Sequence, residues 1–193
     1  WIEYNSDENS PHEATRTAYD PNAHQFNVVR GNNDGFILKI YDIGNATWSA
    51  APILLPEHSS YYWSVFDIVF DVQNDVLVLA TWSNDGILGE YIYTYDNNAA
   101  EWTSITTCGS GGEGYGINLA YNYDTRKVIL GKYYQSYLQL YEIDINNGSC
   151  DNIVNFQAGF GSQQPTNDGL VYDSKRNRYI YVSRYQENII LNE

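Results

Sequence analysis

The sequence predicts an all-β fold built from four repeated units, each with four antiparallel strands, arranged around a common axis. A phrase of an aromatic residue, Asp or Asn, a polar turn and a strand-like run occurs four times. Its anchoring aromatics lie 51 residues apart and are Tyr19, Phe70, Tyr121 and Tyr172. The 193 residues include 19 tyrosines and five tryptophans, and aromatic side chains favour strands. A period of about 50 residues in strands and turns is typical of a radial array, because one unit cannot bury both of its faces alone.

The four strands of a unit, labelled A to D in chain order, are clearest in the first unit. Strand A ends at Asp20, B covers 25–30, C covers 36–41 and D begins at Trp48. The B–C connection is Asn-Asp-Gly at 33–35 and again 51 residues later, which favours tight hairpins because glycine accepts positive φ. The prediction is one β-propeller domain over 1–193, with blades at about 12–53, 63–107, 114–156 and 166–193.

The C–D connections carry a second repeated pattern. Residues 41–48 read YDIGNATW and residues 95–102 read YDNNAAEW, with Trp at the seventh position after Tyr. This pattern resembles the kelch-type propeller repeat, and the resemblance implies a propeller fold. The glycine pair that kelch repeats carry after strand B is absent, and Gly148 stands at the expected Trp position of the third unit. The resemblance implies no activity, because one fold hosts many functions.

The two ends of the sequence complement each other. The fourth unit has strands A to C at 170–172, 179–183 and 188–191 but no strand D. Residues 1–4, WIEY, have the pattern of a strand D without the three strands before it. Trp1 precedes the first anchoring aromatic by 18 residues, and Trp102 precedes the third by 19. We therefore expect residues 1–4 to close a four-bladed ring, which would remove the free edges. The alternative is four consecutive blades of a larger propeller.

Charge and hydropathy exclude two classes of partner. The net charge is −14, from 24 acidic and 10 basic residues, and an acidic surface repels nucleic acid and anionic lipid. No apolar run approaches the roughly 20 residues that span a bilayer. We therefore expect neither nucleic-acid binding nor membrane insertion.

Several features favour a secreted or cell-surface protein. The chain has no methionine and starts at Trp1, so we expect a processed protein or a piece of a longer one. Asn45 and Asn147 begin glycosylation sequons. Cys108 and Cys150 fit no zinc-ligand spacing, and they permit either one disulfide or two free thiols.

Candidate ligand-binding residues gather in the D–A and B–C connections, which share one end of the blades because successive strands alternate in direction. They are Trp63, Trp82, Tyr61, Tyr62, Tyr115, Tyr133, Tyr134, Tyr185 and His58. Aromatic rings cover the apolar face of a sugar while amides bind its hydroxyls, and aromatics also anchor protein partners. The alternative is that these aromatics pack between blades.

A second set of candidates lies on the innermost strands. Arg16, Asp67 and Asn118 each stand three residues before an anchoring aromatic, where strand A would line a central channel. They predict either a polar ring that binds an ion, water or ligand group, or a solvated channel with an internal Arg16–Asp67 pair.

Catalytic motifs are scarce. The three histidines have no metal-binding spacing, and the Gly-Ser-Gly-Gly run at 109–112 lacks the lysine of a phosphate loop. We predict no cofactor. Calcium is an alternative at the acidic clusters 7–8 and 32–34, although neither matches an EF-hand loop. The expected function is non-enzymatic extracellular recognition of a glycan or a protein. One alternative is a self-associating structural subunit of an extracellular filament or coat. Another is a hydrolase or lyase using carboxylates at the channel mouth, drawn from Glu57, Asp67, Glu113 and Asp168.

Overall fold

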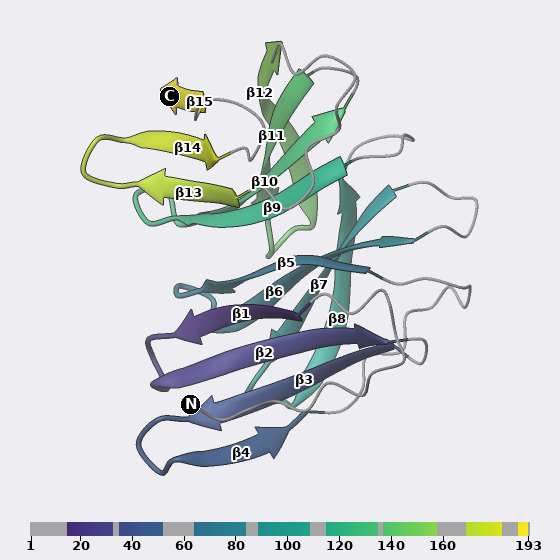
Figure 1. Cartoon of the computed structure of the whole chain (residues 1–193), viewed down its shortest axis with the longest axis vertical. Helices are drawn as coiled ribbons and strands as arrows, with labels where there is room; N and C mark the ends of the chain where they lie inside the picture. The colour runs from purple at the N-terminus through teal and green to yellow at the C-terminus, as the bar shows by residue number, and fades with distance from the viewer. Residues whose placement is uncertain are drawn as a thin grey trace.

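Four antiparallel sheets follow one another in chain order in the computed structural model (Figure 1). The structure describes residues 15–32, 35–51, 64–83, 89–108, 115–134, 137–157, 169–182 and 189–192. Within these ranges the backbone forms strands and turns, and no helix there is long and apolar enough to cross a membrane. We call the sheets blades 1 to 4.

The blades have the strand order that the repeat predicts, each strand pairing with its neighbours in sequence. Blade 1 contains β1 (Thr15–Asp20), β2 (Gln25–Asn32), β3 (Gly35–Asp42) and β4 (Thr47–Ala50). Blade 2 contains β5 (Ser64–Asp71), β6 (Val76–Ser83), β7 (Gly89–Asp96) and β8 (Glu101–Cys108). Blade 3 contains β9 (Tyr115–Asn122), β10 (Lys127–Tyr134), β11 (Tyr137–Asp144) and β12 (Ser149–Gln157). Blade 4 contains β13 (Gly169–Asp173), β14 (Arg178–Val182) and β15 (Ile189–Asn192).

The innermost strands of the blades lie side by side in the order β1, β5, β9 and β13. Blade 1 lies at the lower end of the long axis, and blades 3 and 4 lie next to each other at the upper end (Figure 1). Among the described residues, no sheet joins the first blade to the last. Residues 1–4, predicted to close the ring, and the Asn-Asp pair of the first predicted hairpin lie outside the described residues. The four-bladed ring therefore stays a prediction.

Each inner blade is buried on both faces, which explains the apolar run VLVLA at 76–80 in β6. Leu77 and Leu79 pack in a cluster with blade 1, whereas Val78 and Ala80 pack in a cluster with blade 3. A third cluster, around Leu140 and Tyr181, joins blades 3 and 4. Fully burying one such aliphatic side chain stabilises the fold by about 1.5–3 kcal/mol. The interfaces between blades are therefore the hydrophobic core.

One turn geometry recurs in the A–B and C–D hairpins, which share one end of the blades. The last strand residue is Asp or Asn, and in six of the seven turns its side-chain oxygen accepts backbone N–H groups further along the turn. The Asp173 carboxylate of the seventh turn accepts from the side chains of Arg176 and Arg178. Asp71 Oδ1, for example, accepts from Gln73 N at 2.9 Å and Asn74 N at 3.1 Å. The fourth turn residue has positive φ, at His24, Ala46, Asp75, Ala100, Arg126, Gly148 and Asn177. The Asp or Asn in the repeated phrase is thus the turn-forming residue.

The strand register corrects the interpretation of Gly148 as the third unit's counterpart of Trp. Trp48 pairs with Tyr41 and Trp102 with Tyr95, and the corresponding pair in blade 3 is Ile143 with Cys150. Gly148 occupies the positive-φ turn position, with φ of 71°. In blades 1 and 2 the tyrosine directly precedes the aspartate that begins the turn, whereas in blade 3 Tyr141 lies three residues before Asp144. Counting seven residues from Tyr141 therefore gave Gly148 instead of Cys150.

Exchanging glycine and alanine at the positive-φ position is expected to change stability in opposite directions. Ala100→Gly should raise the free energy of unfolding by about 0.5–1 kcal/mol, because it relieves a left-handed alanine. Gly148→Ala should lower it by at least about 1–2 kcal/mol. An added Cβ at Gly148 would also lie 3.0 Å from the Ile105 carbonyl oxygen. Urea unfolding of the two variants tests this, and a stabilised Gly148→Ala protein would contradict it.

Candidate functional site

The D–A and B–C end of blade 3 brings several candidate aromatics into register. Tyr115, the first residue of β9, lies opposite Tyr133 of β10. Tyr134, the last residue of β10, lies opposite Tyr137 of β11. Trp82 is the second-last residue of β6 in blade 2, and so lies at the same end of its blade as Tyr133 and Tyr134 do in blade 3. The backbone therefore places Trp82, Tyr115, Tyr133 and Tyr134 at the end of the blades where the sequence predicted them.

The other aromatic candidates cannot be placed. The candidates that lie outside the described residues are Trp63, Tyr61, Tyr62, Tyr185 and His58.

Two exposed aromatics at the same end of blade 3 were not singled out by the sequence. Tyr137 is 39% exposed and Phe156 is 42% exposed. Tyr137 pairs with Gln157, and Phe156 pairs with Leu138. Position 137 falls where the hairpin signal of the third unit fades, and Phe156 stands near the end of an outer strand, so only their exposure reveals them. We call Tyr115, Tyr133, Tyr134, Tyr137 and Phe156 the aromatic end of blade 3.

The predicted channel residues lie on adjacent inner strands, Arg16 on β1, Asp67 on β5 and Asn118 on β9. The Asp67 carboxylate accepts Leu119 N of β9 at 2.8 Å and Ile68 N at 2.9 Å. Burial raises the pKa of Asp67, although these hydrogen bonds and the charge of Arg16 lower it. Asp67 thus links blades 2 and 3 through the β9 backbone, and a ligand-binding role for the three residues stays a prediction.

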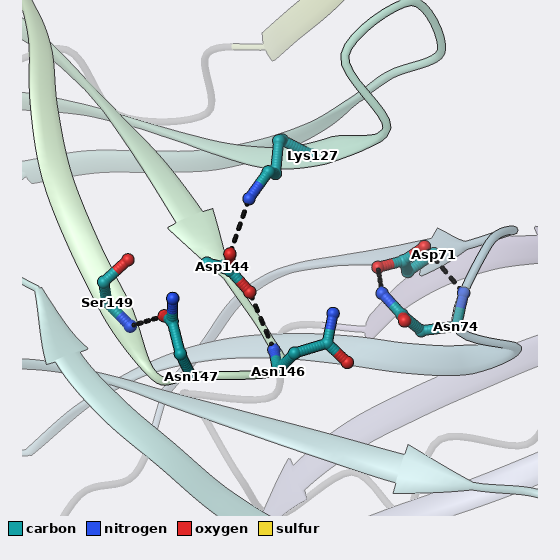
Figure 2. Close-up of polar contacts among 7 residues, drawn as sticks. All are labelled: Asp71, Asn74, Lys127, Asp144, Asn146, Asn147 and Ser149. Carbon is teal, nitrogen blue, oxygen red and sulfur yellow. Dashed lines mark hydrogen bonds and ion pairs between the residues drawn. The ribbon is translucent and has the colours of Figure 1, made fainter.

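A polar cavity of about 180 Å³ lies at the opposite end, among the A–B turns of blades 2 and 3 and the C–D turn of blade 3. Asp71 and Asp144 contribute carboxylates to it, and Lys127 contributes an ammonium group (Figure 2). Asp144 Oδ2 accepts from Lys127 Nζ at 2.7 Å, and its Oδ1 accepts from Asn146 N at 2.9 Å. Asp71 Oδ2 accepts from Asn74 Nδ2 at 2.7 Å. The carboxylates of this cavity thus stabilise the turns by accepting hydrogen bonds from turn residues and from Lys127.

The ion pair in this cavity is expected to make stability depend on acid pH. The hydrogen bond from Lys127 and that from the Asn146 backbone lower the pKa of Asp144 below its usual 3.8. The stability that this carboxylate contributes is therefore fully present above about pH 4. It is lost as the pH falls through the lowered pKa. Asp144→Asn and Lys127→Gln should both melt below wild type at pH 6, and both differences should shrink as the pH falls below 3.8 and through the lowered pKa of Asp144. A difference that persists at low pH would contradict this, as measured by thermal unfolding across the pH range.

In the structure the two cysteines form a disulfide bond rather than two free thiols. Cys108, at the end of β8, is bonded to Cys150, the second residue of β12, and their Cα atoms are 5.6 Å apart. Cys108 is fully buried. The bond joins the outer strands of blades 2 and 3.

The two sequons lie in C–D turns, at the end of the blades opposite the candidate aromatics. Asn45 and Asn147 are both exposed. Asn45 Nδ2 donates to Asp42 Oδ2 at 2.9 Å, and Asn147 Oδ1 accepts from Ser149 N at 2.8 Å (Figure 2). Glycosylation of either asparagine stays a prediction.

Metal-ligating side chains do not cluster in the part of the chain that the structure describes. No group of three or more His, Cys, Asp or Glu residues there is arranged to hold a metal ion.

Comparisons with known proteins show the fold. No family model matches the chain, and no curated protein matches it significantly. An auxiliary nutrient binding protein from Bacteroides ovatus matches 87% of this chain at 16% identity, with a TM-score of 0.58. TolB from Acinetobacter baumannii matches 92% at 13% identity and a TM-score of 0.57. An engineered GH43 glycoside hydrolase with endo-xylanase and exo-arabinofuranosidase activity matches 93% at 9% identity and a TM-score of 0.60.

These structures are β-propeller-type folds, so the likeness confirms an all-β, propeller-type architecture. The match covers only 35%, 40% and 38% of their respective lengths, so this chain spans about two-fifths of each. These likenesses are not specific to kelch repeats, and the kelch-type assignment stays a prediction.

Proposed function

We propose that this chain is a non-enzymatic extracellular recognition module that binds a glycan at the D–A and B–C end of its blades. The observation that carries the proposal is the aromatic end of blade 3. Exposed Tyr137 and Phe156 stand there beside the register pairs of Tyr115 with Tyr133 and Tyr134 with Tyr137.

The chemistry of this end suits a sugar. An aromatic ring covers the apolar face of a pyranose, and neighbouring amides bind its hydroxyl groups. Asn155 and Gln157, both exposed, flank Phe156 on β12, and Gln157 lies opposite Tyr137. Gln157 therefore shares one face of the sheet with Tyr137, and Phe156 lies on the other face with Leu138.

The opposite end offers less to a ligand. Its Asp and Asn side chains accept hydrogen bonds from their own turns, and Asp144 also holds Lys127. The sequons lie at that end, so glycans attached there would leave the proposed binding end clear. A disulfide suits an oxidising compartment, which is consistent with an extracellular location.

No observation favours the hydrolase alternative over recognition. Of the carboxylates considered for it, Asp67 alone lies within the described residues, and its oxygens accept two backbone N–H groups. The nutrient-binding and glycoside hydrolase activities belong to proteins of 16% and 9% identity, a likeness that extends to the fold alone.

A glycan array followed by calorimetry on the best ligand tests the proposal. Tyr137→Ala and Phe156→Ala should each weaken binding at least about tenfold, because each removes an aromatic anchor. Tyr123→Ala is the matched control, since Tyr123 is an exposed tyrosine in the A–B turn of the same blade. Binding lost equally in all three variants, or no glycan bound by the wild type, would overturn the glycan assignment.

A further inference from the structure

The interface between blades 1 and 2 contains a buried amide at a position where the other blades carry aliphatic side chains. Asn27, the third residue of β2, is fully buried. The third residue of β6 is Val78, and the third residues of β10 and β14 are Ile129 and Ile180. The blade fold therefore does not need a polar side chain at this position.

The Asn27 side chain lies on the face of blade 1 that packs against blade 2. Asn27 is opposite Ala18 of β1 and Ile40 of β3, and both of these residues pack against the cluster that blades 1 and 2 share. Asp20 lies two residues after Ala18 on β1, so it is on the same face. Asp20 is 1% exposed. Asn27 and Asp20 are therefore diagonal neighbours at this interface.

Blade 2 places a second amide at the same interface. Asn97 directly follows the last residue of β7, and its Nδ2 donates to Asp20 Oδ2 across the interface at 3.3 Å. Ile145 has the equivalent place in blade 3, directly after the last residue of β11. It packs against the cluster that contains Val78. An Asn–Asn pair at the interface of blades 1 and 2 thus stands where the next interface has a Val–Ile pair.

Three polar atoms of the two asparagines have no hydrogen-bond partner among the described residues. They are Asn27 Nδ2, Asn27 Oδ1 and Asn97 Oδ1, and all three are buried. The two amides are therefore not hydrogen-bonded to each other. Burying such atoms without a partner is costly, and native proteins satisfy nearly all of them. One donor group and two acceptors at this interface thus call for a bound group that both accepts and donates.

We propose that a water molecule is bound between Asn27 and Asn97 and links blade 1 to blade 2. Water accepts a hydrogen bond from Asn27 Nδ2 and donates one to Asn27 Oδ1 and one to Asn97 Oδ1. These are the roughly three hydrogen bonds that a buried water usually makes. A metal cation would bind the two oxygens but would leave Asn27 Nδ2 without an acceptor, so the unpaired atoms fit water better.

The bound water gives the interface of blades 1 and 2 a chemistry that differs from that of the next interface. If blade 1 packed against the C–D turn of blade 3, Asn27 would face Ile145, whose side chain forms no hydrogen bond. An unpaired amide disfavours that wrong contact, whereas Asn97 and the water satisfy it in the native one. The two asparagines therefore favour blade 2 as the neighbour of blade 1.

Thermal unfolding of the whole chain tests the proposal through variants that copy the Val–Ile pair. Asn27→Val and Asn97→Ile should each lower the melting temperature by about 2–10 °C, because each removes hydrogen bonds of the water. The double variant should melt above either single variant, since an apolar pair needs no water. Asn98, exposed in the same turn, supplies the matched control. Asn98→Ile should not rescue Asn27→Val.

Nuclear magnetic resonance of the wild type identifies the bound group. The side-chain NH₂ of Asn27 should show Overhauser contacts to a long-lived water, and Asn97→Ile should lose them. An Asn27→Val protein that melts above wild type would overturn the proposal, because the amide would then be unpaired in solution. Absence of the water contacts in wild type would also overturn it. So would a melting temperature that rises with Na⁺, K⁺ or Ca²⁺, but not with choline at equal ionic strength, if Asn27→Val abolishes the rise, since the bound group would then be a cation.

Discussion

Replacing Cys108 and Cys150 together with alanine is expected to lower the free energy of unfolding by about 4 kcal/mol. The bond joins residues 42 apart in sequence, and closing a loop of that length restricts the unfolded chain by roughly this amount. The variant weakens the interface between blades 2 and 3, because the disulfide bond joins the outer strands of these two blades. Cys150 stands where blades 1 and 2 carry Trp48 and Trp102. A covalent bond therefore takes the place of an aromatic contact at that position.

Urea unfolding with and without a reducing agent measures this effect. Reduced wild type should unfold at nearly the same urea concentration as the double alanine variant, and the variant should not respond to the reductant. Equal midpoints for oxidised wild type and the variant would show that the bond contributes no net stability.

Replacing Asn122 with alanine is expected to lower the free energy of unfolding by about 2–4 kcal/mol, because at least three hydrogen bonds are lost. Asn122 Oδ1 accepts from Asp124 N at 2.9 Å and Thr125 N at 3.1 Å, which shapes the A–B turn of blade 3. Its Nδ2 donates to the Tyr179 hydroxyl at 2.6 Å, and both residues are buried. One side chain thus connects a turn to the interface with blade 4.

Asn122→Asp is the matched control, since the equivalent residues of the other units are Asp20, Asp71 and Asp173. The carboxylate keeps the turn acceptors and can accept from the Tyr179 hydroxyl, so we expect a loss below about 1 kcal/mol. Tyr179→Phe removes the hydroxyl that accepts from Asn122 Nδ2 and keeps the turn acceptors, so its stability should fall between those of the two variants. An Asn122→Asp protein as unstable as Asn122→Ala would show that the Nδ2 donor, rather than the turn, carries the effect.

The repeated phrase predicted the hairpins well because its information is local. The Asp or Asn at the end of each strand A forms hydrogen bonds within three residues, so spacing alone locates the turn. The first unit shows the same precision, with B predicted at 25–30 and observed as β2 (Gln25–Asn32). The candidate aromatics Tyr115, Tyr133 and Tyr134 were placed at the correct end for the same reason, since strand alternation fixes the end at which each connection lies.

The sequence repeat could not predict that Cys108 and Cys150 form a disulfide bond. Cys108 ends one strand D and Cys150 nearly begins the next, so the two occupy different positions in their units. A repeat compares equivalent positions and carries no information about a bond between unequal ones. The exposure of Tyr137 and Phe156 depended in the same way on the packing of blade 3.

The sequence by itself determined the units, their turns and the alternation that buries both faces of an inner blade. The tertiary structure alone decided which aromatic rows are covered. Tyr19 and Tyr121 hold the same position in their units, yet Tyr19 is exposed and Tyr121 is buried. The physical reason is that a strand pattern encodes which side chains share a face, whereas burial depends on whether another blade lies against that face.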